Sequence, residues 1–121
     1  MLEAIRIPIV VNGDMSSTIV STVVRLEQMW GYMIQAIYTT SGTLGGILSL
    51  EASVSYNLDP LGNVLNAGTW TTVLDSPKLI TGAGDYIWDM TRTAAPYVRL
   101  RYAPAGGDTG TLNAFQCIKG V

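Results

Sequence analysis

The residue types that most often perform acid–base or nucleophilic chemistry are sparse in this sequence. It contains no histidine and a single cysteine, Cys117. Without histidine, a Ser-His-Asp triad, a Cys-His pair and a histidine-based metal site are all excluded. Cys117 lies within the strand-like segment Phe-Gln-Cys-Ile-Lys, and a buried free cysteine behaves as a small hydrophobic residue. We therefore predict that Cys117 is a packing residue and not a nucleophile, which would need a base or a cation beside it.

The nine acidic residues are scattered along the chain, so no pair of carboxylates suited to glycoside hydrolysis stands out. Most of them occupy turn-like segments, where Asp commonly accepts hydrogen bonds from nearby backbone amides. These turn residues are Asp14, Asp59, Asp75, Asp85 and Asp108. Residues 57–63 could offer oxygen ligands to calcium, but they lack the dense alternating Asp spacing of calcium loops. We expect no catalytic residue, no metal and no cofactor, and hence a protein that is not an enzyme.

Three tryptophans, Trp30, Trp70 and Trp88, leave two interpretations open. Aromatic side chains on a β-sandwich can stack on sugar rings, or they can pack in the core or between subunits. Trp88 follows Tyr86 by two positions, so these two side chains should share one face of a strand. We favour packing and keep a glycan contact as the alternative.

Charged residues are rare in this chain. Asp, Glu, Lys and Arg make up 13% of it, against about 25% in soluble domains. Hydrophobic residues make up 48%, and the mean hydropathy is +0.30. Either hydroxyl side chains keep the surface solvated, or much of the surface is covered by other copies of the chain or by a partner. We favour the second explanation.

The charges that are present argue against two classes of partner. The formal net charge is -2, and Lys and Arg form no cluster. Nucleic-acid binders need a concentrated basic surface to displace the counterions of phosphates, so a nucleic-acid partner is not expected. No apolar stretch approaches the roughly 20 residues that cross a bilayer, so a membrane partner is not expected either.

Residues 47–56 alternate between apolar and polar types, as a strand with one buried and one wetted face does. The even-numbered residues here and in residues 97–102 are predicted to face the core. They are Leu48, Leu50, Ala52, Val54, Val98, Leu100 and Tyr102. A slip of one residue would instead bury Glu51 and Arg99.

Similar patterns recur along the chain, with turn signals between them. Pro8 cannot donate to a strand ladder, so residues 5–11 are predicted to form an edge strand. Residues 32–38 are apolar on both faces apart from Gln35, which suits a central strand covered on each side. About eight strands are expected in all. The predicted fold is all-β, a single antiparallel two-sheet sandwich of jelly-roll-like type over residues 1–121, with an N-terminal edge strand or arm at residues 1–11.

Two segments are candidates for contact with a partner. The edge strand at residues 2–11 presents backbone groups with which another chain can pair. The loop at residues 57–68 carries four aliphatic side chains that are costly to leave in water, although they could instead fold back and seal one end of the sandwich. The predicted partner-binding residues are Leu2, Ile5, Ile7, Ile9, Leu58, Leu61, Val64 and Leu65.

Taken in order, several motifs resemble those of small phage virion proteins of β-sandwich type. They are Thr-Ile-Val at 18–20, Tyr-Met-Ile-Gln-Ala-Ile-Tyr at 32–38, Ser-Gly-Thr-Leu-Gly-Gly-Ile-Leu-Ser-Leu-Glu-Ala-Ser at 41–53, Gly-Thr-Trp at 68–70, Tyr-Val-Arg-Leu-Arg-Tyr at 97–102 and Gly-Thr-Leu-Asn-Ala at 110–114. The chain is also similar to sugar-binding discoidin-like sandwiches. Here residues 55–58 read Ser-Tyr-Asn-Leu where those proteins have a Ser-x-Asp-Gly turn, which weakens any transfer of their ligand-binding residues.

The resemblance implies a non-enzymatic structural protein located in the virion. We expect a capsid decoration or cement subunit, which binds the outer shell and holds neighbouring shell proteins together. Its partners would be other copies of itself and a major capsid or tail protein. The low charge suits a molecule with several covered faces, and the acidic balance suits a surface away from the packaged genome. The alternatives are a tail, baseplate or fibre module, and a carbohydrate-binding sandwich.

Overall fold

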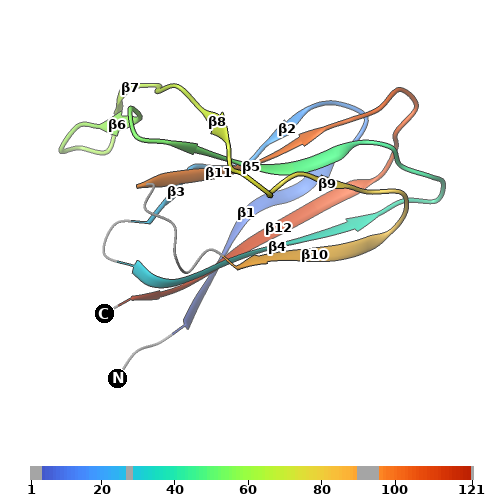
Figure 1. Cartoon of the computed structure of the whole chain (residues 1–121), viewed down its shortest axis with the longest axis horizontal. Coiled ribbons are helices and arrows are strands. Elements are labelled where there is room, and N and C mark those ends of the chain that lie inside the picture. The colour runs from blue at the N-terminus through green and yellow to red at the C-terminus, as the bar shows by residue number, and fades with distance from the viewer. Residues whose placement is uncertain (1–3, 27–28, 90–95, 121) are drawn as a thin grey trace.

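We describe residues 4–26, 29–89 and 96–120 of the chain in a computed structural model. These residues form strands and connecting turns, and none of them is helical. The long strands lie in two layers (Figure 1). The predicted all-β antiparallel sandwich is confirmed. Nowhere in these three ranges does the chain build a helix with the length and apolar character that a membrane crossing requires.

Four long antiparallel strands form the first sheet, in the order β1-β12-β4-β10. They are β1 (Ala4–Asp14), β4 (Met29–Thr39), β10 (Gly84–Asp89) and β12 (Thr111–Gly120). β1 and β10 lie at the two ends of this order, so the segment that contains Pro8 is an edge strand, as predicted. β1 pairs with β12, which makes strands from opposite ends of the chain direct neighbours.

The second sheet is built on β5 (Ile47–Ser53) and β11 (Tyr97–Ala103), which pair with each other. Four short strands flank them: β2 (Ile19–Val20) and β3 (Val24–Arg25) on β11, and β8 (Thr71–Thr72) and β9 (Lys78–Leu79) on β5. Since β2 and β3 share one partner, and β8 and β9 another, each sheet has four strand positions. These eight positions match the number of strands expected from the sequence. β6 (Asn57–Leu58) and β7 (Val64–Asn66) form a separate hairpin.

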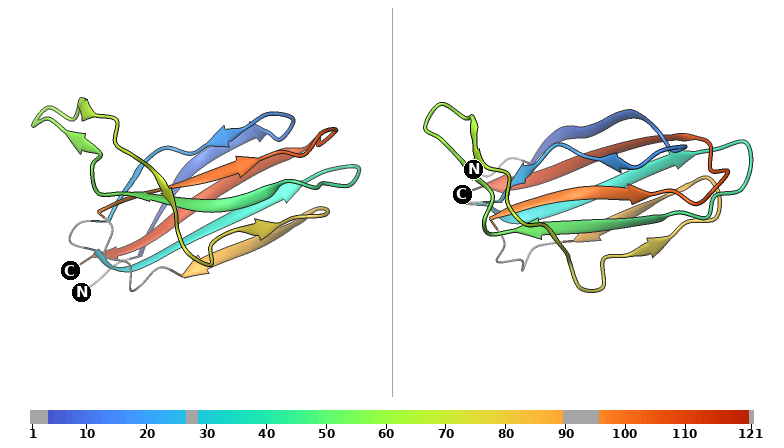
Figure 2. Two further views of the ribbon diagram at one scale, coloured as in Figure 1. Left: turned by 45° about the horizontal axis from the view of Figure 1, so that its top comes forward. Right: turned by 90° about the horizontal axis from the view of Figure 1, so that it is seen from above.

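Between the eight strand positions, the chain passes from one sheet to the other at six of the seven connections. β1 leads to β2 and β3 in the second sheet, β4 lies in the first sheet again, and β10, β11 and β12 alternate in the same way (Figure 2). A jelly-roll-like winding requires such crossings, and an up-and-down meander lacks them. The crossings place segments that are distant in sequence side by side, so the core forms from the whole chain.

The pairing of β5 with β11 confirms the predicted register. Five of the residues predicted for the core are buried between the sheets: Leu48, Leu50, Val98, Leu100 and Tyr102. Ala52 is half-buried and packs against the same core. Glu51 and Arg99 lie opposite each other on the outer face, where Arg99 Nε donates to Glu51 Oε1 over 2.8 Å. The odd-numbered Glu51, Arg99 and Arg101 keep part of their surface in water, as the alternation predicted. The odd-numbered Ser49, Ser53 and Tyr97 are instead buried.

Val54 does not belong to the core, and this part of the prediction is wrong. Its side chain is 81% exposed. β5 ends at Ser53, whose Oγ accepts hydrogen bonds from the backbone N–H groups of Ser55 at 3.3 Å and Tyr56 at 3.0 Å. This local turn ends the two-residue alternation before Val54, because a side-chain acceptor replaces the next strand partner.

The prediction that residues 32–38 are covered on both faces holds for one face only. Tyr32, Ile34, Ala36 and Tyr38 are buried against the second sheet. Met33 and Ile37 point the other way and are exposed. We call this outer surface of the β1-β12-β4-β10 sheet the open face.

Buried polar contacts join two loops at one end of the sandwich. The Tyr102 hydroxyl donates to the carboxylate of Asp108, which also accepts from the backbone N–H groups of Gly45 and Ala105, each at 3.0 Å. The Tyr102 hydrogen bond is the main cause that lowers the pKa of Asp108 from its ordinary 3.8; burial opposes it and the amides add to it. The ionised carboxylate therefore ties the β4–β5 connection to the β11–β12 connection.

The assigned core predicts a contrast between two aliphatic truncations. Leu50→Ala should lower the free energy of unfolding by about 2–5 kcal/mol, because it removes buried methyl groups and leaves a cavity. Val54→Ala should change it by less than about 0.5 kcal/mol, because that side chain is in water. Urea unfolding followed by tryptophan fluorescence measures both. A large loss for Val54→Ala would contradict the end of β5 at Ser53.

The Asp108 network predicts a pH dependence. Because the pKa of Asp108 is lowered on folding, its contribution is present above the ordinary carboxyl pKa and is lost as the pH falls through the folded-state value. Between about pH 5 and about pH 2, wild type should lose more unfolding free energy than Asp108→Asn. Asp75→Asn, which neutralises an exposed carboxylate, is the matched control and should follow wild type. Parallel curves for wild type and Asp108→Asn would rule out this role.

Candidate partner-binding surfaces

Asp59 and Asp14 act locally, as predicted for the turn carboxylates, whereas Asp85 lies in β10 and accepts from the Gln35 side chain, and Asp108 also accepts from the distant Gly45. Asp59 accepts hydrogen bonds from the backbone N–H groups of Leu61 at 2.9 Å and Asn63 at 2.8 Å, and Asp14 accepts from that of Ser16 at 2.9 Å. The backbone N–H groups of Asn63 and Ser16 lower the pKa of Asp59 and Asp14, respectively. Across the described ranges, His, Cys, Asp and Glu form no group of three or more that could hold a metal ion.

Two of the tryptophans are held by contacts within the chain. Trp88 is buried, and its Nε1 donates to the backbone oxygen of Ser76 over 2.9 Å. The Trp70 ring lies under the Arg99 guanidinium, 4.2 Å from its centroid, and Trp70 Nε1 donates to the backbone oxygen of Ala67 over 2.9 Å. Trp88 therefore packs in the core, as favoured from the sequence, whereas Trp70 is half-buried on the outer face of the second sheet. The side chain of Trp30 lies outside the described residues.

The open face carries apolar side chains in register across four strands. One row runs Arg6, Cys117, Met33 and Asp89 from β1 to β10, and the next runs Pro8, Phe115, Gln35 and Ile87. Residues paired directly across an antiparallel ladder point to the same side of the sheet. Met33 is 42% exposed and Ile87 is 48% exposed. The centre of the face therefore presents hydrophobic surface to water.

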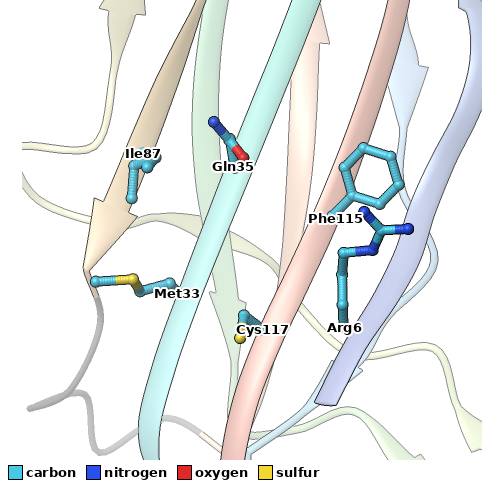
Figure 3. Close-up of a pocket in the computed structure, with 6 residues that line it drawn as sticks. All are labelled: Arg6, Met33, Gln35, Ile87, Phe115 and Cys117. Atoms are coloured by element: carbon cyan, nitrogen blue, oxygen red, sulfur yellow. The ribbon is translucent and has the colours of Figure 1, made fainter. Parts of the chain in front are cut away.

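These two rows form a shallow hollow of about 150 Å³, shown in Figure 3. It is lined by Arg6, Met33, Gln35, Ile87, Phe115 and Cys117. The Arg6 guanidinium lies over the Phe115 ring, 4.9 Å from its centroid, and Gln35 Nε2 donates to Asp85 Oδ2 over 3.1 Å. The Arg6 and Gln35 side chains are thus held by contacts with other residues of the open face, while the floor of the hollow is apolar.

The prediction that Cys117 packs inside the protein is wrong, because Cys117 is exposed on the open face. The neighbouring Gln116 takes the inward position, where it is buried opposite Ile34. Here β12 points a polar residue inward and Phe115 and Cys117 outward. The sequence carries one relevant signal, the two-sided apolar pattern of residues 32–38, which reflects an uncovered outer face and not coverage within the domain.

The loop predicted at residues 57–68 is an arm built on the β6–β7 hairpin. Figure 2 shows it projecting from one end of the sandwich. Leu61 is 88% exposed, Leu65 is 64% exposed and Val64 is also exposed, so these three side chains do not fold back to seal the sandwich; Leu58 is half-buried. The Asp59 hydrogen bonds and the positive φ of Gly62 (88°) fix the tip of the arm.

The structure places the side chains of two of the four N-terminal candidate residues, and it places them differently. Ile9 is buried in the core, so its side chain does not face a partner. Ile7 is exposed on β1, opposite the buried Gln116. Ile5 belongs to β1, but its side chain, like the whole of Leu2, lies outside the described residues. The arm and the open face therefore present more described apolar surface than the N-terminal strand.

The exposure of the Cys117 thiol can be tested directly by chemical modification. In dilute native protein, an uncharged maleimide should modify Cys117 at a rate within about tenfold of that in urea-unfolded protein, because the thiol is accessible. Mass spectrometry of the time course measures the rate, and Cys117→Ser is the blank. Modification only after unfolding would place the thiol in the core.

A scan of protein-family models gave no match to this chain, and a search of curated proteins gave none either. Among solved structures, the chain is similar to the SPBc2 prophage-derived protein YomS, with a TM-score of 0.53. The alignment covers 99% of this chain and 96% of that protein, at 9% sequence identity. At this identity the likeness concerns the fold: a prophage-derived protein of nearly the same extent folds in a similar way.

Proposed function

We propose that this chain is a non-enzymatic structural protein of a phage particle, and specifically a decoration subunit bound to the outside of the capsid. The observation that carries the proposal is the β6–β7 arm, which holds aliphatic side chains out in water. The phage assignment is supported by the likeness in fold to a prophage-derived protein and by the resemblance of several motifs to those of small virion proteins.

The exposed aliphatics of the arm are a source of binding free energy. Burying one such side chain in a partner contributes about 1.5–3 kcal/mol, so Leu61, Val64 and Leu65 together supply several kcal/mol per copy. Subunits that bind an assembled shell but not its separated proteins stabilise the assembly by mass action. A binding energy of this size per copy is adequate because many copies act on one particle.

The arm is also ordered before it meets a partner. Asp59 accepts hydrogen bonds from two backbone amides of the hairpin tip, and the backbone N–H of Gly68 donates to Asn66 Oδ1 over 2.8 Å. A loop that is already fixed loses little conformational entropy on binding. Contacts made by the arm would therefore retain most of the hydrophobic gain.

Two alternative functions are considered beside this proposal. A tail, baseplate or fibre module would use the arm in the same way on a different partner. A carbohydrate-binding module is less favoured, because one side of the Trp70 ring is already covered by the Arg99 guanidinium and its indole N–H is already bonded.

The test compares two matched double variants in binding to capsids prepared without the protein. Leu61→Ser with Leu65→Ser should weaken co-sedimentation with capsids about tenfold or more, because each change removes buried apolar area from the contact. Leu74→Ser with Leu79→Ser, two exposed leucines outside the arm, should bind as wild type does. Capsids with wild-type protein should also break at a higher temperature than bare capsids.

Several outcomes would overturn the decoration role. Equal binding by the arm variant and wild type would remove the arm from the contact. Binding to isolated tails in place of capsids would favour the tail module. Saturable binding of a free oligosaccharide, with no binding to either particle, would favour the carbohydrate module.

A further inference from the structure

The open face is apolar at its centre and carries opposite charges at its two edge strands. The central strands β12 and β4 present Phe115, Met33 and Ile37 at the centre, with the polar Gln35 and Asn113 among them, and Ile87 lies beside them on β10. Among the charged side chains that the structure describes on this face, Arg6 lies on β1, and Asp85 and Asp89 lie on β10. β1 and β10 are the outermost strands of the sheet, so the positive and negative edges are separated by the apolar centre.

The strand register places two of these charges at the same height along the strands. Arg6 pairs with Cys117, Cys117 with Met33 and Met33 with Asp89. The four residues therefore form one row across the sheet, with Arg6 at one end and Asp89 at the other. A surface with this pattern is complementary to itself when it is turned so that its two edges exchange places.

We propose that two copies of this chain pack their open faces against each other about a two-fold axis that runs parallel to the strands. This rotation lays β1 of one copy over β10 of the other, and β12 over β4. It sets each Arg6 across from Asp89 of the second copy, and it sets Cys117 against Met33. A two-fold axis perpendicular to the strands would instead lay β1 over β1, and the opposite charges would not meet.

The apolar centre provides the stabilisation, and the charges select the orientation. Two sheets pack face to face about 10 Å apart with their side chains interleaved. Exposed Met33, Ile37 and Ile87 would leave water in this arrangement. A two-fold interface uses the same patch on both copies, so each favourable contact occurs twice. The pattern of residues 32–38, apolar on both faces, then matches a strand that is covered on each side.

The dimer leaves the β6–β7 arm free. The arm follows β5 of the second sheet, and Figure 1 shows it on the far side of the sandwich from β4 and β10. A dimer would therefore present two arms pointing away from its interface. This geometry provides two attachment points on one particle, but the dimer itself does not depend on the decoration role.

Sedimentation velocity over a concentration series tests the interface. Wild type should pass from monomer to dimer as its concentration rises. Arg6→Glu and Asp89→Arg should each weaken the dimer about tenfold or more, because each places like charges opposite each other. The double variant should recover wild-type association, because it restores opposite charges at both ends. Arg101→Glu, a charge reversal on the second sheet, is the control and should dimerise normally.

Wild type also provides a measurement that requires no substitution. Maleimide modification of Cys117 should slow several-fold over the same concentration range in which the dimer forms, because Cys117 becomes covered. Leu61→Ser with Leu65→Ser should still dimerise, which separates this interface from capsid binding. A wild-type monomer at all concentrations, no recovery in the double variant, an unprotected Cys117 in the dimer, or dissociation by the arm variant would each overturn the proposal.

Discussion

β5 and β11 pair in a single register, and the rest of the sandwich depends on it. Leu50 opposite Leu100 and Leu48 opposite Tyr102 fix which side of the second sheet is apolar. A shift of one residue would turn the Glu51–Arg99 ion pair toward the core, and burying two charges costs several kcal/mol for each ion. The alternating pattern therefore strongly disfavours a register shifted by one residue. The first sheet packs against the apolar side of the second sheet.

The outer faces of the two sheets differ in chemistry. On the second sheet, Arg99 is bonded to Glu51 and covers Trp70, so charged and aromatic groups satisfy one another in contact with water. On the first sheet, Met33 and Ile87 are exposed to water, and the polar group paired with Ile87 is the Gln35 amide, which donates to Asp85. This asymmetry gives the molecule one side suited to solvent and one suited to a partner, and it offers a physical reason for the low charge of the chain.

The arm and the open face lie on different elements, so two contacts can be made at the same time. The hairpin of the arm is fixed by Asp59, and the β4–β5 and β11–β12 connections are joined by Asp108 and Tyr102. The Asp59 carboxylate acts on amides of its own turn, whereas the Asp108 carboxylate joins two connections that are distant in the sequence. Rigid connections keep both surfaces in place before binding, and this preserves the free energy that binding releases.

The sequence by itself determined the all-β class, the inward-facing sides of β5 and of β11, the edge position of β1 and the capping roles of turn aspartates such as Asp59. Each follows from local alternation or turn chemistry, which a few neighbouring residues specify. Only the tertiary structure decided that Val54 lies beyond the end of its strand, that Cys117 faces outward, and that residues 32–38 have one uncovered face. Periodicity indicates that the two faces of a strand differ. Which face is covered depends on the layer that packs against the strand. The positions of the layers are set by pairings between strands that are distant in the sequence.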